Sequence, residues 1–338
     1  MPEKPYEVFV VHGRGAQRSY DDAQAAIAHL PAKLTVLSNI ADERGMIDAL
    51  RNADGVIIAA SPMTRAVMSA CEGLKVVVRT GVGYDVIDVP AATDLGVVAV
   101  NVPDIWVREV ANHAVALLLA LNRKIINLDR GVHAGTWGGG VPGPFTGSLH
   151  GETVGIVGLG NIGRAFAKRI GAFEMTVIGY DPYVDDATFK ALGVERATSL
   201  EELAARADYV SVHTLLSKET HHLIGEKFFA RMKPTGILIN TSRGPVVDEA
   251  ALITALQEKK LAGAALDVFE KEPVDKDNPL LKMDNVITTP HAAYFSSPAV
   301  AQVPKRCGEE VARVLSGQRP LNPINPEVYA PGAARRAR

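Results

Sequence analysis

Three side chains with complementary chemistry follow three predicted strands in the second half of the chain: Arg243, Glu272 and His291. Parallel strands end at one edge of a sheet, where open α/β sheets bind ligands, so we expect the three to lie together. A guanidinium can clasp a carboxylate and polarise a carbonyl. An imidazole that a carboxylate holds in one tautomer can pass a proton as a hydride moves. The set predicts reduction of a 2-keto acid by a nicotinamide cofactor. Each residue alone also fits an ordinary surface or loop position.

A glycine motif supplies a candidate site for that cofactor. The apolar run Val154–Val157 reads as a buried strand, and Gly158, Gly160 and Gly163 follow it as G-x-G-x-x-G at the start of a helix. In such a turn the first glycine permits the tight bend, the second lets backbone approach a pyrophosphate, and the third lets helix and strand pack closely. The helix N-terminus offers free N–H groups to the phosphates. The motif also fits a purely structural turn.

An acidic residue at the end of the next strand favours the nucleotide interpretation. Asp181 follows the predicted strand 176–180, about 20 residues beyond the glycines, where a carboxylate accepts hydrogen bonds from the adenosine ribose. The same carboxylate would repel the 2′-phosphate of NADP, and no arginine follows it directly. The sequence therefore predicts NAD as the cofactor.

A second glycine loop lies in the first half of the chain. Arg79, Thr80, Gly81, Val82 and Gly83 follow a predicted strand at 75–79. Alternate glycines allow backbone N–H groups to converge on an anion, and Arg79 would add a guanidinium. The same residues fit a plain turn into the next helix, so the residues alone leave both interpretations open.

The chain around these motifs has the composition of a globular α/β protein of two domains. It has 338 residues, of which 47% are hydrophobic and 22% charged, and strand and helix patterns alternate with short connections on both sides of the glycine motif. One long helix is expected from about Asp104 to Arg130, and a last helix from about Pro298 to Leu315.

Charge and cysteine content exclude several function classes. The formal net charge of −2 gives no case for nucleic acid or an anionic membrane as partner. Cys71 and Cys307 form no motif, which favours a reducing cytoplasm without structural disulfides, and no metal site is predicted. No signal-peptide core or membrane-spanning segment is expected.

Seven segments in order resemble the D-isomer-specific 2-hydroxyacid dehydrogenases: RTGVGYDVID, VGIVGLGNIG, GYDP, VSVHTLLSKETHHLI, NTSRGPVVDEAAL, GAALDVFEKEP and TTPHAAY. The resemblance implies that Arg243 binds and orients substrate, that Glu272 assists, and that His291 is the acid/base. It further implies a substrate-binding set of Arg79, Gly81, Val82, Gly83 and Tyr294. The implied NAD-binding set is Gly158, Gly160, Asn161, Ile162, Gly163, Asp181, His213, Thr214, Thr241, Ser242 and Asp267.

The same resemblance implies a domain arrangement. The fold class is α/β, with two Rossmann-like or flavodoxin-like domains that contain parallel sheets. The NAD domain, residues 103–293, is inserted into a substrate domain made of residues 1–102 and 294–330, and 331–338 is expected to be a disordered tail. Members are usually homodimers, with the helix after Pro103 at the interface.

Two other functions stay open. Within the family, GYDPYVDD, HTLLSKETHHLI and PHAAYFS are similar to dehydrogenase-like C-terminal-binding proteins, NAD(H)-sensing corepressors that carry Trp where Tyr294 stands here. Phosphoglycerate dehydrogenases are also similar, but many of them carry a further regulatory domain. Oxidation of a small anion such as formate or phosphite by the same fold is the third possibility. The sequence does not name the substrate.

Overall fold

The computed structural model of the chain describes residues 4–12, 19–38, 40, 42–137 and 147–333. It divides into two compact domains, each taken here by itself: the first contains 1–106 and 296–338, and the second contains 107–295. The crossings lie two to four residues beyond the expected boundaries at 102/103 and 293/294. At the first crossing the indole N–H of Trp106 donates to the carbonyl of Thr80 at 3.0 Å, which ties residue 106 to the first domain.

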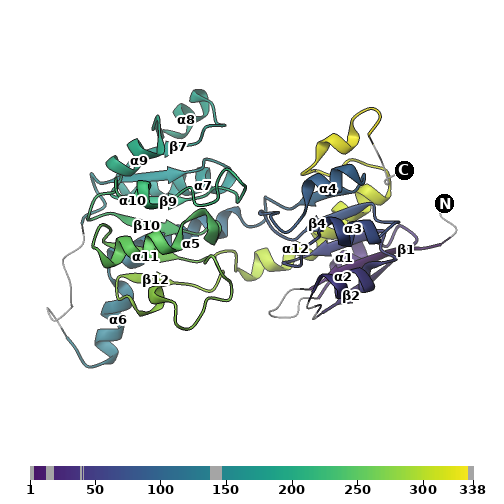
Figure 1. Cartoon of the computed structure of the whole chain (residues 1–338), viewed down its shortest axis with the longest axis horizontal. Coiled ribbons are helices and arrows are strands. Elements are labelled where there is room, and N and C mark those ends of the chain that lie inside the picture. The colour runs from purple at the N-terminus through teal and green to yellow at the C-terminus, as the bar shows by residue number, and fades with distance from the viewer. Residues whose placement is uncertain (1–3, 13–18, 39, 41, 138–146, 334–338) are drawn as a thin grey trace. The chain divides into compact units, whose positions relative to one another are not determined.

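The first domain is built on a five-stranded parallel sheet in the order β2-β1-β3-β4-β5 (Figure 1). This is the flavodoxin-like order. The chain adds β2 on one side of β1 and the later strands on the other, so the topological switch point lies between β1 and β3. All four residues of β3 are buried, as expected when helices cover both faces of a parallel sheet. The strands are β1 (Tyr6–Val11), β2 (Ala32–Leu37), β3 (Gly55–Ile58), β4 (Val76–Arg79) and β5 (Val98–Asn101); the helices are α1 (Asp21–Ile27), α2 (Glu43–Leu50), α3 (Arg65–Ala70), α4 (Val89–Asp94) and α12 (Ser297–Leu315).

The second domain has a seven-stranded parallel sheet in the order β12-β11-β10-β9-β6-β7-β8. Its first six strands in chain order follow the Rossmann arrangement, with the change of direction between β6 and β9. The strands are β6 (Thr153–Val157), β7 (Thr176–Tyr180), β8 (Glu195–Arg196), β9 (Tyr209–Val212), β10 (Ile237–Asn240), β11 (Gly263–Leu266) and β12 (Val286–Thr288). The helices are α5 (Val107–Asn122), α6 (Ile125–His133), α7 (Asn161–Ile170), α8 (Asp186–Leu192), α9 (Leu200–Arg206), α10 (Glu226–Phe229) and α11 (Glu249–Gln257).

The expected two-domain α/β fold with parallel sheets is confirmed, but the single long helix from Asp104 to Arg130 is wrong. It is two helices, α5 and α6, separated by Lys124, whose φ of 51° lies in the left-handed region. Of the predicted disordered tail at 331–338, residues 334–338 lie outside the described part of the chain. Among the described helices, none is both long and apolar enough to cross a membrane.

The last helix completes the first domain. Helix α12 packs against α1 and lies along β3 and β4, so the end of the chain covers the sheet that its beginning forms. The closest approach is at Gly308, where an added Cβ would lie 2.7 Å from both the Cα and the carbonyl oxygen of Ala23. A glycine at this point lets the two helix backbones meet.

We expect Gly308→Ala to destabilise the protein by about 1–3 kcal/mol, because the methyl group must push α12 away from α1. Gly171→Ala is the matched control, since a Cβ there meets nothing within 4 Å and its φ of −59° suits alanine. Urea unfolding of both variants measures the difference. Equal stabilities for the two would show that the α1–α12 contact tolerates a side chain.

Candidate active site and dinucleotide site

The loop after β12 carries His291, and a buried carboxylate determines its shape. His291 has a φ of 53°, a strained conformation for a residue with a Cβ. Its N–H donates to the carbonyl of Asp267 at 2.8 Å. The Asp267 side chain, only 1% exposed, accepts hydrogen bonds from the hydroxyl of Thr289 and from the amides of Ala292 and Ala293. Asp267 thus anchors the turn on both sides of the histidine.

Glu272 holds the imidazole from the neighbouring loop, after β11. Its Oε2 lies 2.7 Å from Nδ1 of His291, and its Oε1 accepts from the amide of Phe269 at 3.1 Å. Burial alone would raise the pKa of Glu272, but the bond to His291, together with the positive charges of His291 and Arg243, lowers it below its ordinary value. Glu272 is therefore a carboxylate at neutral pH. The histidine side chain is 40% exposed, so its other ring nitrogen remains reachable.

Arg243 comes from the loop after β10. Its Nη1 donates to the carbonyl of Ser242 at 2.8 Å, and its own carbonyl accepts from the side-chain amide of Asn240 at 3.0 Å. The next residue, Gly244, packs so tightly on the backbone of Phe269 and Glu270 that a Cβ would overlap it. The loop of Arg243 is thereby pressed against the loop of Glu272. The structure brings the three predicted catalytic residues to one edge of one sheet, as the sequence predicts.

The glycine motif adopts the conformations that its residue types suggest. Gly158 has a φ of 93°, which a side chain would strain, and a Cβ on Gly163 would overlap the carbonyl of Gly158. A Cβ on Gly160 would meet nothing within 4 Å, so the backbone there faces open space. Asn161 and Ile162 form the first residues of α7, whose N-terminus points its amides toward that space. The geometry fits a pyrophosphate.

Asp181 stands at the end of β7 beside this loop. Its Oδ2 accepts from the amide of Leu159 at 2.8 Å, and its Oδ1 accepts from the amide of Tyr183 at 2.9 Å. Each carboxylate oxygen has a second lone-pair position, which leaves acceptor capacity for ribose hydroxyls.

Three buried polar atoms at the ends of β9 and β10 have no hydrogen-bond partner among the described residues: Nδ1 of His213 and the hydroxyls of Thr214 and Thr241. Such orphaned atoms are rare in a protein interior unless a ligand supplies the partner. Burial of its ring lowers the pKa of His213 to about 3, so this imidazole is neutral and offers a hydrogen bond rather than a charge. The residues present fit a bound dinucleotide.

The Arg79 loop belongs to the first domain and follows β4. Nη1 of Arg79 donates to the hydroxyl of Thr80 at 3.2 Å, and a Cβ on Gly81 would lie 2.8 Å from the same nitrogen. The guanidinium folds over Gly81, so a side chain at 81 would displace it from this position. The side chain of Asn101 donates to the carbonyl of Val82 at 2.7 Å, which holds the loop against the end of β5.

Two positioning residues were not predicted. Asn240 accepts from both the amide and the hydroxyl of Ser242 and so shapes the loop of Arg243. His113 on α5 bonds the hydroxyl of Thr289 at 3.0 Å and lies 3.7 Å from Asp267. Together with Asn112, His113 interrupts the apolar stretch 110–121, and that interruption was the only signal for it in the sequence.

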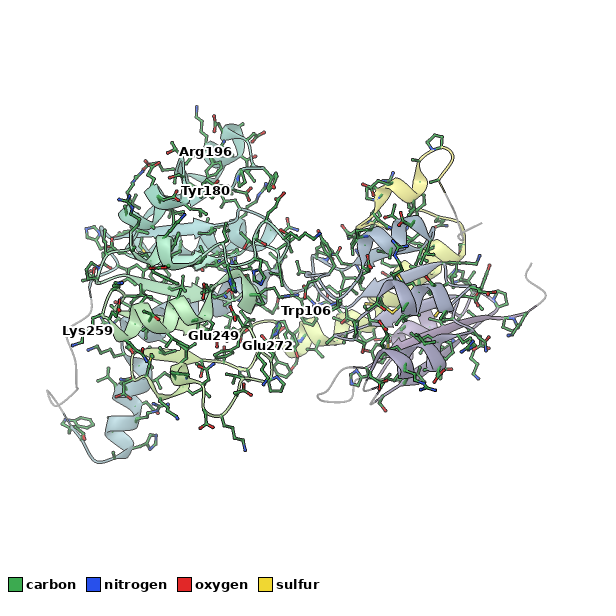
Figure 2. All side chains as sticks on the ribbon, viewed as in Figure 1. Trp106, Tyr180, Arg196, Glu249, Lys259 and Glu272 are labelled. Carbon is green, nitrogen blue, oxygen red and sulfur yellow. The ribbon has the colours of Figure 1, made fainter. Side chains whose placement is uncertain are left out.

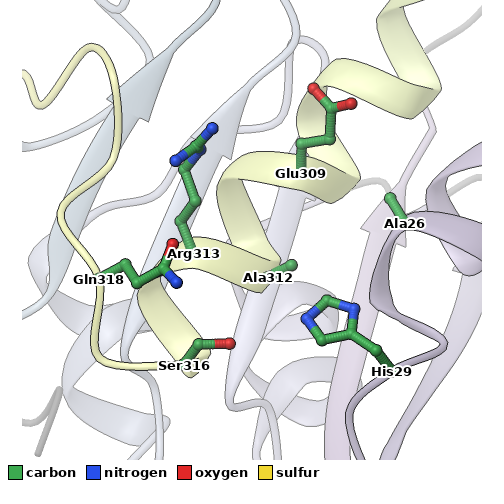
Figure 3. A pocket seen from close by; sticks show the side chains of 7 residues that line it. All are labelled: Ala26, His29, Glu309, Ala312, Arg313, Ser316 and Gln318. Carbon is green, nitrogen blue, oxygen red and sulfur yellow. The ribbon is translucent and has the colours of Figure 1, made fainter.

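A surface pocket of about 260 Å³ lies elsewhere, against α1 and α12 of the first domain (Figure 3). None of the residues predicted for catalysis or for dinucleotide binding lines it. The lining residues are Ala26, His29, Glu309, Ala312, Arg313, Ser316 and Gln318.

Comparison with known proteins agrees with the geometry in indicating a dinucleotide-binding dehydrogenase domain. The family profile described as "D-isomer specific 2-hydroxyacid dehydrogenase, NAD binding domain" matches residues 115–293. A glyoxylate reductase of Korarchaeum cryptofilum is 41% identical over 286 residues, which are 84% of this chain and 86% of that protein.

Two further relatives extend the comparison. A D-3-phosphoglycerate dehydrogenase of Methanocaldococcus jannaschii is 40% identical over 282 residues, 83% of this chain and 53% of that protein, so the chain spans about half its length. The crystal structure of an NADPH-dependent glyoxylate/hydroxypyruvate reductase from Sinorhizobium meliloti, in complex with NADP and malonate, superposes with a TM-score of 0.83 at 28% identity and covers 96% of this chain and 98% of that chain. The profile match, the glyoxylate reductase that aligns over most of both chains, and the two parallel α/β sheets agree. The chain belongs to the D-isomer specific 2-hydroxyacid dehydrogenase family and has that family's site for a nicotinamide dinucleotide.

Proposed function

We propose that the protein is an NAD-dependent oxidoreductase that interconverts a 2-keto acid and a D-2-hydroxy acid. The observation that supports this best is the 2.7 Å hydrogen bond between His291 and Glu272, beside Arg243. It lies at the carboxyl edge of the sheet, where the Gly158–Gly163 loop also follows its strand. A proton donor, its orienting carboxylate and a guanidinium are the groups that reduction of a keto acid requires.

The mechanism assigns roles to Arg243, Glu272 and His291. A nicotinamide dinucleotide held at the Gly158–Gly163 loop would supply the hydride for reduction of the keto carbon and would accept it in the reverse reaction. Arg243 binds the carboxylate of the substrate and polarises its carbonyl. His291 protonates the developing alkoxide from Nε2, because Glu272 holds Nδ1 and fixes the tautomer. In oxidation His291 accepts the hydroxyl proton instead.

The residues assigned to the cofactor are those that its motif and the orphaned atoms indicate. Gly158, Gly160, Asn161, Ile162 and Gly163 would hold the pyrophosphate, and Asp181 the adenosine ribose. We assign the remaining contacts to the ends of β9, β10 and β11: His213, Thr214, Thr241, Ser242 and Asp267. The free lone pairs of Asp181 support NAD over NADP, since a 2′-phosphate would meet its charge.

The substrate is a small 2-keto acid by this proposal. The relatives compared are named glyoxylate reductase and D-3-phosphoglycerate dehydrogenase, and neither they nor the profile support the corepressor alternative. We assign Arg79, Gly81, Val82, Gly83 and Tyr294 to substrate binding. Glyoxylate, hydroxypyruvate, pyruvate and 3-phosphohydroxypyruvate, each offered with NADH and with NADPH, test the proposal. Absence of NADH oxidation with every keto acid would refute it.

A homodimer in the cytoplasm is part of the proposal. Helix α6 has no buried residue, and it exposes Ile125, Ile126, Leu128 and Val132, with 37–54% of each accessible. An apolar stripe of this kind on one helix is typical of a surface that another protein covers. Cys71 and Cys307 are both buried as thiols, which suits a reducing compartment. Analytical ultracentrifugation measures the oligomeric state.

Asp181→Ala is expected to raise the KM for NAD and to narrow its advantage over NADP, because the variant lacks both the ribose acceptor and the charge that repels a 2′-phosphate. Steady-state kinetics with each cofactor give the ratio. Asp185→Ala, which removes a nearby carboxylate that caps α8, is the control and should leave the preference unchanged. An unaltered preference in Asp181→Ala would remove this residue from the ribose site.

His291→Gln is expected to lower kcat by about two to four orders of magnitude while NADH still binds, as for the loss of a general acid. Glu272→Gln should cost less, and should move the pH profile of kcat to lower pH because the imidazolium form loses its carboxylate partner. Fluorescence titration of NADH separates binding from turnover in both variants. A kcat near that of the wild type in His291→Gln would contradict the mechanism.

Arg79→Ala is expected to raise the KM for the keto acid, since it removes a charged hydrogen-bond donor worth roughly 1.5–3 kcal/mol, and to leave NADH affinity nearly unchanged. Arg243→Ala should lower kcat as well, because that guanidinium acts on the reacting carbonyl. Both would be measured with the best substrate of the panel. An unchanged KM in Arg79→Ala would show that the loop after β4 is only a turn.

A further inference from the structure

An interaction outside the predicted site joins the loops that carry the catalytic residues. His222 lies between β9 and α10, and its Nε2 is 2.7 Å from Oε1 of Glu270, two residues before Glu272. On the other side of the ring, Nδ1 lies 3.8 Å from Oδ2 of Asp248, five residues after Arg243. One imidazole therefore stands between two carboxylates that come from the Arg243 loop and from the Glu272 loop.

The backbone of the same segment fixes the ring where it stands. His222 has a φ of 53°, and its N–H donates to the carbonyl of Pro245 at 2.8 Å. Ile224 donates to the carbonyl of Val246 at 3.1 Å and accepts from the amide of Asp248 at 3.0 Å. The segment 222–224 thus runs along 245–248 and cannot shift without breaking several hydrogen bonds.

Glu270 connects His222 to the loop that carries Glu272. Its Oε1 also accepts from the amide of Glu249 at 3.2 Å, and its own amide donates to Oε2 of Glu249 at 3.1 Å. Figure 2 labels Glu249, the first residue of α11, and Glu272 in the loop after β11. Because Glu270 and Glu272 share one tight turn, whose shape the bond from the Phe269 amide to Glu272 fixes, a displaced Glu270 would move the carboxylate that orients His291.

We propose that His222 is a positioning residue for the reaction: its hydrogen bond to Glu270 holds the Glu272 loop against the Arg243 loop. The proposal rests on the proposed function for its kinetic consequence, and on the structure alone for its effect on the loop. His222 touches neither of the groups that react, so it acts only through Glu270 and Glu272.

Two substitutions separate the effect of the His222–Glu270 hydrogen bond from the effect of the backbone conformation at residue 222. Asparagine tolerates a positive φ but is too short to reach Glu270, whereas glutamine places an amide N–H near the position of Nε2. We expect His222→Asn to lower kcat by about 10-fold, with an NADH dissociation constant and a melting temperature close to those of the wild type, and His222→Gln to recover most of the loss. Equal losses in both variants, or no loss in His222→Asn, would overturn the proposal.

His150→Asn is the control, because His150 and Glu174 form another histidine–carboxylate pair, at 3.0 Å, which is largely exposed and remote from the catalytic loops in sequence. It should leave kcat unchanged. Amide hydrogen exchange over residues 268–273 tests the loop without any substrate: exchange should quicken in His222→Asn and not in His150→Asn. If the wild type reduces no keto acid, the proposed function fails, while the exchange result still decides whether His222 holds the loop.

A bound metal is the competing explanation. One ligand atom each from His222, Asp248 and Glu270 lies within 4.8 Å of the others. Wild-type protein dialysed against EDTA should keep its kcat and its exchange rates if a hydrogen bond is what holds the loop. A fall in kcat to that of His222→Asn, restored by Zn²⁺, would overturn the proposal in favour of a metal-held loop.

Discussion

The position of His291, the acid/base of the proposed mechanism, depends on the buried carboxylate of Asp267. A carboxylate that is removed from water is costly unless donors surround it, and here the hydroxyl of Thr289 and the amides of Ala292 and Ala293 do so. These donors are also the backbone on either side of His291. The positive φ of His291 can persist because this set of bonds determines the turn on both sides. The hydrogen bonds of Asp267 thus compensate the backbone strain at His291.

The order of strands in the second sheet explains how the other candidate site residues come together. Strands β9, β10, β11 and β12 are neighbours in the sheet, so the loops that follow them lie side by side at one edge. His213 and Thr214, Arg243, Glu272 and His291 each come from one of these loops. Cross-links between the loops then set the distances, such as the packing of Gly244 on Phe269 and the bond between Glu272 and His291.

Much of the fold and of the candidate site was predictable from the sequence, because both depend on local patterns of residues. The strands read as short apolar runs, since both faces of each sheet are covered, and the three glycines of the motif each correspond to a conformation or a contact. Arg243, Glu272 and His291 were identified from strand ends. The break at Lys124 was not predicted, because no glycine or proline marks it and apolar residues resume directly after Asn122, Arg123 and Lys124. The last helix was predicted, but its place beside α1 requires a contact between residues almost 300 positions apart.

The residues that the sequence did not reveal are the ones that act on other residues. No role was predicted for Asn240, His113 or His222, because a side chain that braces a loop needs only a donor or an acceptor at the right point in space. Asp267 shows the difference well. The resemblance assigns it to the cofactor site, whereas in the structure both of its oxygens accept hydrogen bonds from the turn of His291. Thr289 and Ala292 fill both acceptor positions of Oδ1, whereas among the described residues Oδ2 accepts only from Ala293, so one position remains for a cofactor. Chemical groups can therefore be read from sequence, while the supports that hold them within a fraction of an ångström become visible only once the loops are folded together.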